Sequence, residues 1–410
     1  MDNQPLNTLK PSKLLCTIGL IGLVLMLAYL IARPLWQKWR QRPRVPPRVI
    51  LVPSSLPDLS NITGTDTLKR ALQASRDYLE QRPSSGIVSF GDRKVTVNRL
   101  IRTLDAFSAL LDANLTGKDL KKEIEKKFIV LEVSSRTNEK RPILVTGYYQ
   151  PVIRASKVPI PPFVYPIYGV PTDLVKISLK LFSPELPGMT LWGRVKDGQV
   201  VPYFTRAQIQ EMNLAQRAPV LAYLNSPVQS LMLQIQGSGL LVFPDGSRRY
   251  IHYAASNGHP YRSIGKCLVE KGILKPSQCS WQGIEKWALG HPDAFKRICK
   301  ENPRYIFFKW ERQGPIGTIG RPLTSMVSVA LDPEIYPLGS LAFINVPLGT
   351  ERNRRPDGLL SFVFVQDTGN AIKGPFRLDL YCGQGQGAGE LAGRLKNRGR
   401  LLFLLVKSKK

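Results

Sequence analysis

The longest apolar stretch of the chain lies near its N-terminus, at residues 14–32 (LLCTIGLIGLVLMLAYLIA), after a polar tail at residues 1–13. It carries no charge, and as a helix it would be about 28 Å long, close to the hydrocarbon thickness of a bilayer. No small-residue cleavage site closes the run, which is longer than the apolar part of a secretory signal. The pattern predicts an uncleaved transmembrane anchor, with a cleaved signal peptide as the alternative.

Beyond this stretch, several segments have apolar residues at every third or fourth position. Residues 66–79 and 97–115 follow this spacing, and residues 118–127 form a strongly charged stretch of the same kind. Residues 263–270 and 280–289 also have helical spacing. The pattern predicts amphipathic helices that pack against a core, and it assigns them no chemistry.

Short apolar or alternating runs, typical of strands, make up much of the remaining chain. These runs are 128–133, 143–149, 231–235, 240–243, 326–331, 341–346, 360–366, 376–381 and 401–406. Turns rich in proline and glycine separate them, and Pro244-Asp245-Gly246 is one example. The pattern predicts a mainly β protein with a closed barrel and several packing helices.

Composition marks the boundaries between these regions. Residues 33–59 are rich in proline and arginine and show no periodic apolar face, so they are expected to form a stiff, solvated linker. The many prolines between Pro151 and Pro171 mark a second boundary.

The charge of the chain points to an acidic partner. Of its 410 residues, 58 are Lys or Arg and 30 are Asp or Glu, a formal net charge of +28. Nucleic acid, phospholipid headgroups or an anionic polymer would all satisfy that balance. However, the basic residues are scattered or lie in the linker and in the tail from Arg394, and no nucleic-acid-binding motif accompanies them. We therefore expect no nucleic acid partner.

Common catalytic and metal-binding motifs are missing. The three histidines form no HExxH pair, and no GxSxG elbow is present, which excludes the common zinc proteases and serine hydrolases. We expect no metal and no cofactor. Cys382 remains a disfavoured candidate nucleophile. Cys267, Cys279 and Cys299 could supply a disulfide whose pairing the sequence leaves open.

Three aspartates, Asp332, Asp367 and Asp379, lie where late apolar strands begin or end. Apolar neighbours of Asp379, such as Leu378 and Leu380, would raise its pKa by desolvation, as a general acid near neutral pH requires. From spacing alone, however, turn and cap roles are the more common explanation of such aspartates.

Two further groups could contact a sugar. Gln236 and Ser238 lie in a Gln-Gly-Ser-Gly segment. There an amide and a hydroxyl lie beside glycine backbone that a ligand can approach closely. Tyr148 and Tyr149 follow Gly147 and could form a stacking platform. A tight turn and ordinary strand packing are the alternative explanations.

Several of these motifs, taken together and in order, resemble the membrane-bound lytic murein transglycosylase A (MltA) family with its C-terminal 3D domain. The resemblance covers about residues 65–406. The matching segments are Thr146–Pro151, Tyr165–Tyr168, Gln236–Gly239, Asn257–Lys266, Asn302–Phe308, Ala330–Asp332, Gln366–Gly374 and Leu378–Tyr381.

This resemblance implies a double-psi β-barrel formed by residues 60–152 and 314–410, with a second β-domain inserted at residues 153–313. It also implies cleavage of the β-1,4 bond between N-acetylmuramic acid and N-acetylglucosamine of peptidoglycan, without water, to give 1,6-anhydro-N-acetylmuramic acid. In that reaction Asp379 would act as acid and then as base, Asp367 would assist it, and Asp332 would be structural. The residues expected to bind substrate are Tyr148, Tyr149, Gln236, Ser238, Gly258, Tyr261 and Lys373.

The resemblance also implies partners and a location. Peptidoglycan strands are the expected substrate, with the membrane reached through the N-terminal helix and other cell-wall enzymes as further partners. Familiar members are outer-membrane lipoproteins, but this chain has no lipid-modification box, so the 14–32 segment favours a single-pass inner-membrane anchor with the body outside the cytoplasm. The arginines after that segment run against the positive-inside rule. A periplasmic or outer-membrane protein with a cleaved signal is the alternative location, and a membrane-anchored protein that binds peptidoglycan without cleaving it is the alternative function.

Overall fold

The computed structural model describes residues 49–60, 65–135, 142–347, 349–350, 353–354, 358–369 and 371–408. The transmembrane segment expected at residues 14–32 lies outside this part of the chain. Among the described residues, no helix is long and apolar enough to cross a membrane.

The N-terminal part of the described chain supplies helices that cover one sheet. Its elements are β1 (Val49–Pro53), α2 (Thr65–Glu80), β2 (Ile87–Phe90), β3 (Arg93–Thr96), α3 (Val97–Asp112), α4 (Gly117–Lys127), β4 (Phe128–Ser135) and β5 (Ile143–Gln150). Helix α2 buries Leu68, Leu72 and Leu79 at helical spacing. Thr96 caps α3 by accepting a hydrogen bond from the backbone N–H of Arg99. The helices expected at 66–79, 97–115 and 118–127 are therefore confirmed.

The prediction of a linker at residues 33–59 is wrong for its last part, where Val49–Pro53 form strand β1. Strand β1 pairs antiparallel with β4, with Leu51 opposite Val133. Leu51, Leu56 and Leu59 are almost fully buried. The apolar residues between the prolines in this stretch are too few to show a period, but they are enough to complete the edge of a sheet.

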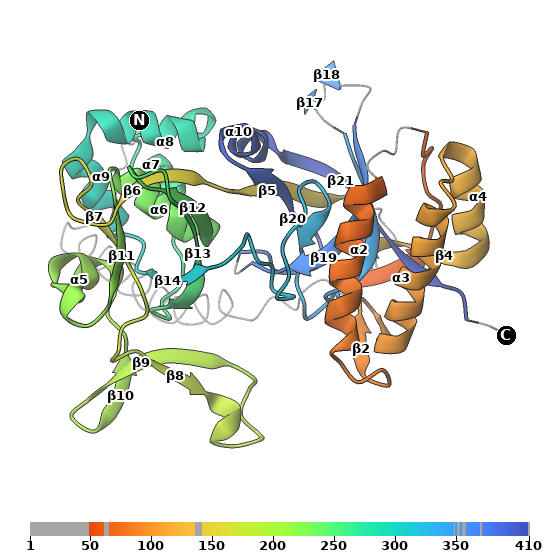
Figure 1. Ribbon diagram of the computed structural model, residues 1–410, viewed down its shortest axis with the longest axis horizontal. Coiled ribbons are helices and arrows are strands. Elements are labelled where there is room, and N and C mark those ends of the chain that lie inside the picture. The colour runs from red at the N-terminus through yellow and green to blue at the C-terminus, as the bar shows by residue number, and fades with distance from the viewer. Residues whose placement is uncertain are drawn as a thin grey trace, which may run out of the picture. The chain divides into compact units, whose positions relative to one another are not determined.

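A closed barrel lies at the centre of this part of the molecule (Figure 1). Its sheet has the order β1-β4-β21-β16-β19-β15-β20-β5, and an additional pairing of β21 with β5 closes six of the strands. The late elements are β15 (Ser328–Ala330), β16 (Leu341–Val346), β17 (Gly349–Thr350), β18 (Asn353–Arg354), β19 (Leu359–Asp367), β20 (Arg377–Gln384), α10 (Gln386–Arg394) and β21 (Lys396–Val406). This closure confirms the mainly β fold with a barrel, while its double-psi connections stay a prediction.

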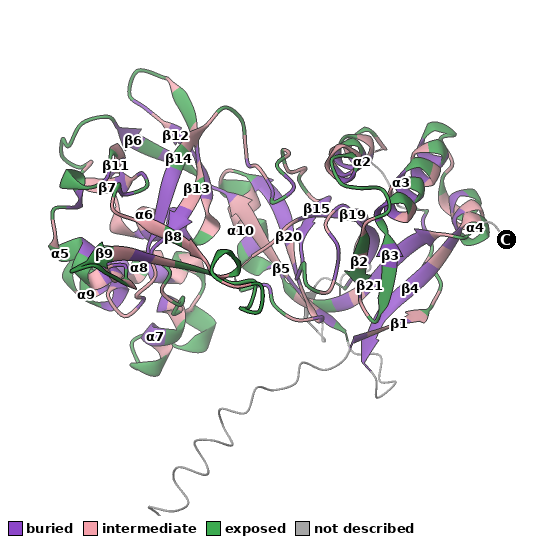
Figure 2. Ribbon diagram, turned by 90° about the horizontal axis from the view of Figure 1, so that it is seen from below, coloured by how far each residue is buried: buried purple, intermediate pink, exposed green. Residues whose placement is uncertain are grey.

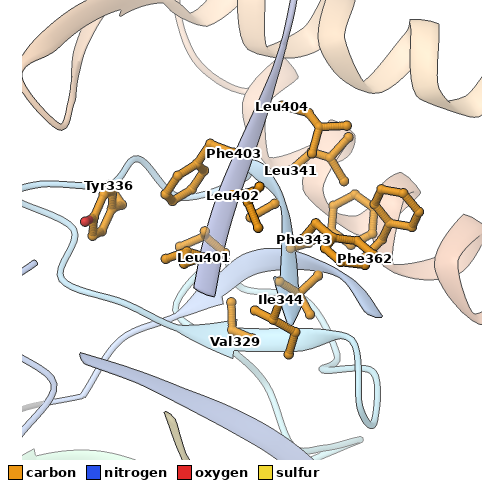
Figure 3. Close-up of a cluster of buried hydrophobic side chains, with 14 of the residues drawn as sticks. Val329, Tyr336, Leu341, Phe343, Ile344, Phe362, Leu401, Leu402, Phe403 and Leu404 are labelled. Atoms are coloured by element: carbon orange, nitrogen blue, oxygen red, sulfur yellow. The ribbon is translucent and has the colours of Figure 1, made fainter. Parts of the chain in front are cut away.

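Large apolar side chains of these strands gather in one buried cluster, to which consecutive residues such as Leu402 and Phe403 contribute (Figure 3). Phe343 and Phe362 meet edge to face with their ring centroids 5.0 Å apart. Tyr336 and Phe403 stack with a centroid separation of 4.9 Å. Because each buried aromatic side chain removes a large apolar area from water, this cluster fixes the strands that hold the late aspartates.

A second group of strands, between β5 and β15 in the chain, forms a six-stranded sheet with the order β14-β13-β12-β6-β11-β7 and a three-stranded sheet with the order β10-β9-β8 (Figure 1). Its strands are β6 (Val152–Ser156), β7 (Tyr165–Tyr168), β8 (Val175–Ser178), β9 (Thr190–Lys196), β10 (Gln199–Pro202), β11 (Val220–Leu224), β12 (Ser238–Val242), β13 (Arg248–Ser256) and β14 (Ile306–Glu311). Its α-helices are α5 (Arg206–Glu211), α6 (Pro227–Gln236), α7 (Ile264–Glu270), α8 (Trp281–Gly290) and α9 (Pro292–Cys299). The boundaries 60–152, 153–313 and 314–410 stay predictions.

Two expectations fail in this second region. The strand expected at 231–235 is part of helix α6, which Ser226 caps and which ends at Gly237 with a φ of 77°. A short apolar run does not distinguish a buried helix from a strand.

No disulfide joins Cys267, Cys279 and Cys299, which are free thiols. They pack among the apolar residues of α7, α8 and α9.

Candidate active site

The aspartates expected to be catalytic lie in one row across the barrel. Asp367 on β19 and Asp379 on β20 both pair with Ala330 on β15, and Asp379 also pairs with Thr146 on β5. A register shift between Val329 and Ala330 brings Asp367, rather than Gln366, opposite Ala330. Strands lie about 4.8 Å apart, which places the two aspartate α-carbons about 10 Å from each other. Only the methyl group of Ala330 lies between them in this row.

Asp379 has surroundings suited to a general acid. Its pKa is raised to about 6: burial is the largest cause and the nearby charge of Asp367 adds to it, whereas the Thr146 hydrogen bond and the Arg377 charge act in the opposite direction. The Thr146 hydroxyl donates to Asp379 Oδ1 over 2.6 Å. A carboxyl group with this pKa can both donate and accept a proton near neutral pH.

Asp367 is held in place by several donors. The backbone N–H and the hydroxyl of Thr318 donate to its Oδ1 at 3.0 and 2.8 Å, and the Tyr148 hydroxyl donates to its Oδ2 at 2.9 Å. Burial raises the pKa of Asp367, and these hydrogen bonds lower it. Because both oxygens are engaged, this carboxylate is better suited to orienting its neighbours than to moving a proton.

Tyr148 donates a hydrogen bond to Asp367 and also lies within the electrostatic influence of Asp379. Its ring lies 5.4 Å from that of Tyr381, centroid to centroid. Burial, then the charges of Asp367 and Asp379, raise its pKa well above the usual value. The phenol therefore remains a neutral hydrogen-bond donor at any pH where the site works.

Asp332 lies apart from this pair and ties two loops together. Its Oδ2 accepts from the backbone N–H of Gly374 at 2.8 Å, and its Oδ1 accepts from that of Glu334 at 3.2 Å. Lys373 Nζ lies 3.7 Å from Asp332 Oδ1. These contacts engage both Asp332 and Lys373 within the fold, and the structural role of Asp332 and the substrate-binding role of Lys373 stay predictions.

Tyr149, Gln236 and Ser238 lie where the barrel meets the second region. The backbone N–H of Tyr149 donates to Gln236 Oε1 over 3.2 Å, and its hydroxyl contacts Met232 Sδ at 2.7 Å. Gln236 is the last residue of α6, and Ser238 begins β12, opposite His252. Gln236 therefore holds strand β5 against the end of α6, whatever it does with a substrate.

Gly258 and Tyr261 follow β13 in the second region. Gly258 has a φ of 78°, and a β-carbon there would lie 3.0 Å from Trp192 Cβ, so only glycine fits. Tyr261 is 43% exposed. Among the described residues, neither forms a hydrogen bond with Asp367 or Asp379, so nothing here places these two residues at the carboxyl groups.

Cys382 faces away from the aspartates. A β-carbon on Gly147 would lie 2.8 Å from its Sγ, and the same point would touch Ala392 of α10. Burial, with a further contribution from Asp379, raises the pKa of the thiol to about 12. A neutral thiol buried in the core does not act as a nucleophile.

Three residues of the site escaped the sequence analysis: Thr146, Thr318 and Arg377. Thr146 lies within a segment that carried the resemblance, and Arg377 precedes Asp379 by two residues on the same face of β20. Thr318 lies in a loop and has no signal of its own, because only the fold brings it to Asp367. Among the residues described, no three His, Cys, Asp or Glu side chains gather as metal ligands.

Two family descriptions match the chain. The family described as "MltA specific insert domain" matches residues 144–309, and the family described as "3D domain" matches residues 327–405.

Curated relatives from two bacteria carry the same name, "Membrane-bound lytic murein transglycosylase A". That of Escherichia coli (strain K12) is 35% identical over 264 residues, which cover 63% of this chain and 64% of the relative. That of Vibrio cholerae is 34% identical over 266 residues, with coverages of 63% and 64%. The match thus spans slightly less than two thirds of the length of these relatives.

Solved structures resemble the chain over more of its length. A membrane-bound lytic murein transglycosylase from Agrobacterium tumefaciens has a TM-score of 0.71 at 28% identity, covering 87% of this chain and 97% of that one. Escherichia coli MltA with bound chitohexaose has a TM-score of 0.67 at 26% identity, covering 90% and 98%.

Proposed function

Because the chain belongs to the MltA family, we propose that it is a lytic transglycosylase of peptidoglycan. It cleaves the β-1,4 bond between N-acetylmuramic acid and N-acetylglucosamine and leaves a 1,6-anhydro end. The observation that carries this proposal is the half-buried Asp379, whose pKa of about 6 lets one carboxyl group act in both directions.

In the first step, protonated Asp379 gives its proton to the glycosidic oxygen. The bond between that oxygen and C1 of the muramic acid breaks, and positive charge develops at C1 and the ring oxygen. The ionised Asp379 and Asp367 carboxylates both favour that charge.

In the second step, the C6 hydroxyl of the same sugar attacks C1. Its proton passes to the carboxylate of Asp379, which returns to its starting form. An inverting hydrolase needs a second carboxyl group to activate water, whereas here the nucleophile is already attached to the substrate. One proton-transferring group therefore suffices.

The neighbours of Asp379 orient it without transferring protons themselves. Thr146 fixes its Oδ1 at 2.6 Å. Tyr148 and Thr318 fix Asp367, whose negative charge helps to keep Asp379 protonated until the substrate takes the proton.

We further propose that the chain acts at a bacterial membrane on the side where peptidoglycan lies. The support is the word "membrane-bound" in the names of its relatives.

Substitution of Asp379 tests the proposal. Asp379→Asn keeps the shape of the side chain and its contact with Thr146 but removes the transferable proton, so turnover of purified peptidoglycan should be abolished. Asp367→Asn should slow turnover less severely, because Asp367 only assists. Normal turnover by folded Asp379→Asn would contradict the proposal, and tight binding without cleavage by the unmodified chain would favour a peptidoglycan-binding protein instead.

A further inference from the structure

A row of basic residues adjoins the row that holds Asp379. On β20, Arg377 pairs with Leu144 of β5, and Leu144 in turn pairs with Arg398 of β21. In the next row, Asp379 pairs with Thr146, which pairs with Lys396. Register partners, and residues two apart on a strand, share a face. Arg377, Lys396 and Arg398, which we call the basic face, therefore lie on the same face of the barrel as Asp379.

The basic face lies close to the reacting carboxyl group. Residues two apart on a strand are separated by about 7 Å, which is the spacing between Arg377 and Asp379. Arg398 and Lys396 lie two strands away from β20, or about 10 Å. Figure 1 shows β20, β5 and β21 side by side in this part of the sheet.

Within the part of the chain that the structure describes, these three side chains form no ion pair and no hydrogen bond. The Nε of Arg377 is buried without a partner. Arg400, on the same strand as Arg398, differs: its guanidinium lies 2.7 Å from Glu132 Oε2. A buried guanidinium nitrogen without an acceptor is costly, so it indicates a site that an external acceptor completes.

Helix α10 leaves this face uncovered. It contacts β5 through Ala392, which packs where a β-carbon of Gly147 would point. Gly147 projects to the face opposite to that of Thr146 because successive residues of a strand alternate. Lys396 and Arg398 are exposed.

We propose that the basic face binds free carboxylates of the stem peptide that is attached to the N-acetylmuramic acid being cleaved. This inference rests on the proposed function. The glycan itself is neutral, whereas guanidinium and ammonium groups recognise carboxylates through charge-assisted hydrogen bonds. The stem peptide leaves the sugar at C3, beside the reacting C1, and a peptide spans about 3.5 Å per residue. Its second or third residue therefore reaches the basic face while C1 lies at Asp379.

Two substrates separate peptide recognition from cleavage. We would measure kcat/KM of the full chain on glycan strands that keep their stem peptides and on strands from which an amidase has removed them. The unmodified chain should prefer the first. In Arg398→Gln and in Lys396→Gln, the ratio of the two kcat/KM values should fall about tenfold, as expected for the loss of one charge-assisted hydrogen bond.

Arg394→Gln serves as the matched control. Arg394 is an exposed arginine on α10, where its ion pair with Glu390 is 3.3 Å long, and it lies outside the basic face. The ratio of the two kcat/KM values should not change in this variant.

A binding measurement keeps the two proposals distinct. Calorimetric titration with a stem tetrapeptide should show tighter binding than titration with its fully amidated form, and Arg398→Gln should remove that difference. Cleavage of both glycans with the same kcat/KM would overturn the basic-face proposal alone. So would an Arg398→Gln variant that binds the tetrapeptide as tightly as the unmodified chain does. Carboxylate-dependent tetrapeptide binding without cleavage of either glycan would support the basic face and overturn the proposed function.

Discussion

At the scale of single residues, opposing contributions set the pKa of Asp379. Burial and Asp367 disfavour its charge, while Thr146 and Arg377 favour it. The apolar residues Leu378 and Leu380 let the sequence predict the raised pKa. The sequence could not predict the contacts of Thr146 and Thr318, because each acts across a strand or loop far away in the chain.

The pH dependence of turnover should report this balance. The first step needs protonated Asp379, so kcat/KM should fall as the pH rises through about 6. Arg377→Gln removes a charge that lowers the Asp379 pKa, so the fall should move to higher pH. A pH profile of initial rates for both proteins tests this. A fall at the same pH in both would show that Asp379 is not the titrating group.

The change in stability caused by Asp379→Asn should be larger at high pH than at low pH. The pKa of Asp379 is higher in the folded chain than its usual 3.8, so the neutral form stabilises the fold at low pH. That contribution is lost as the pH rises through about 6. Asp379→Asn should therefore gain in Tm relative to the unmodified chain at pH 8 and gain less at pH 4. Thermal unfolding at the two pH values measures the difference, and a larger gain at pH 4 would contradict it.

At the scale of elements, Gln366 anchors the strand that ends in Asp367. It is fully buried, and its Nε2 donates to the backbone carbonyl of Ala71 at 2.6 Å and to Ser75 Oγ at 2.9 Å, both on α2. It also accepts from Ser328 of β15. A helix nearly 300 residues away in the chain thus fixes the end of β19.

Gln366→Ala should therefore destabilise the fold by about 2 kcal/mol, because it leaves buried partners without hydrogen bonds. Urea unfolding measures this loss. Gln73→Ala changes an exposed glutamine of the same helix that bonds to Asp77, and it should change stability by less than about 0.5 kcal/mol. Equal effects of the two substitutions would contradict the anchoring role.

Strand β1 gives a second prediction at this scale. A chain that starts at Val49 keeps the pairing of β1 with β4, whereas one that starts at residue 60 loses it together with three buried leucines. The shorter chain should be less stable by roughly 5 kcal/mol. Urea unfolding of both chains tests this, and equal stability would return residues 49–59 to the linker.

The sequence predicted those helices and strands whose apolar residues recur at regular spacing. Amphipathic helices such as 97–115 and apolar strands such as 341–346 were located because their patterns are long or regular. It failed at 231–235, where an apolar run has no period, and at 49–53, where a strand follows several prolines. In both cases the partner that decides the structure lies elsewhere in the chain.

At the scale of the whole molecule, chain segments far apart in the sequence meet to form the site. Figure 2 shows the buried strands of the barrel beside the second region, and Tyr149 joins the two through Gln236. Motif order along the chain predicted the family, but only the closed sheet brings Asp367, Asp379 and Thr146 into one row. In our proposal, three of the basic residues behind the formal net charge of +28 form the basic face beside that row.

We propose that one carboxyl group cleaves the glycan with the C6 hydroxyl of the substrate as nucleophile. The most direct test is to incubate residues 49–410 with purified peptidoglycan and to identify the products by mass spectrometry. We predict anhydro-muropeptides, each one water lighter than the corresponding hydrolysis product. Products with reducing N-acetylmuramic acid ends would mean that water is the acceptor, and they would overturn the proposed mechanism.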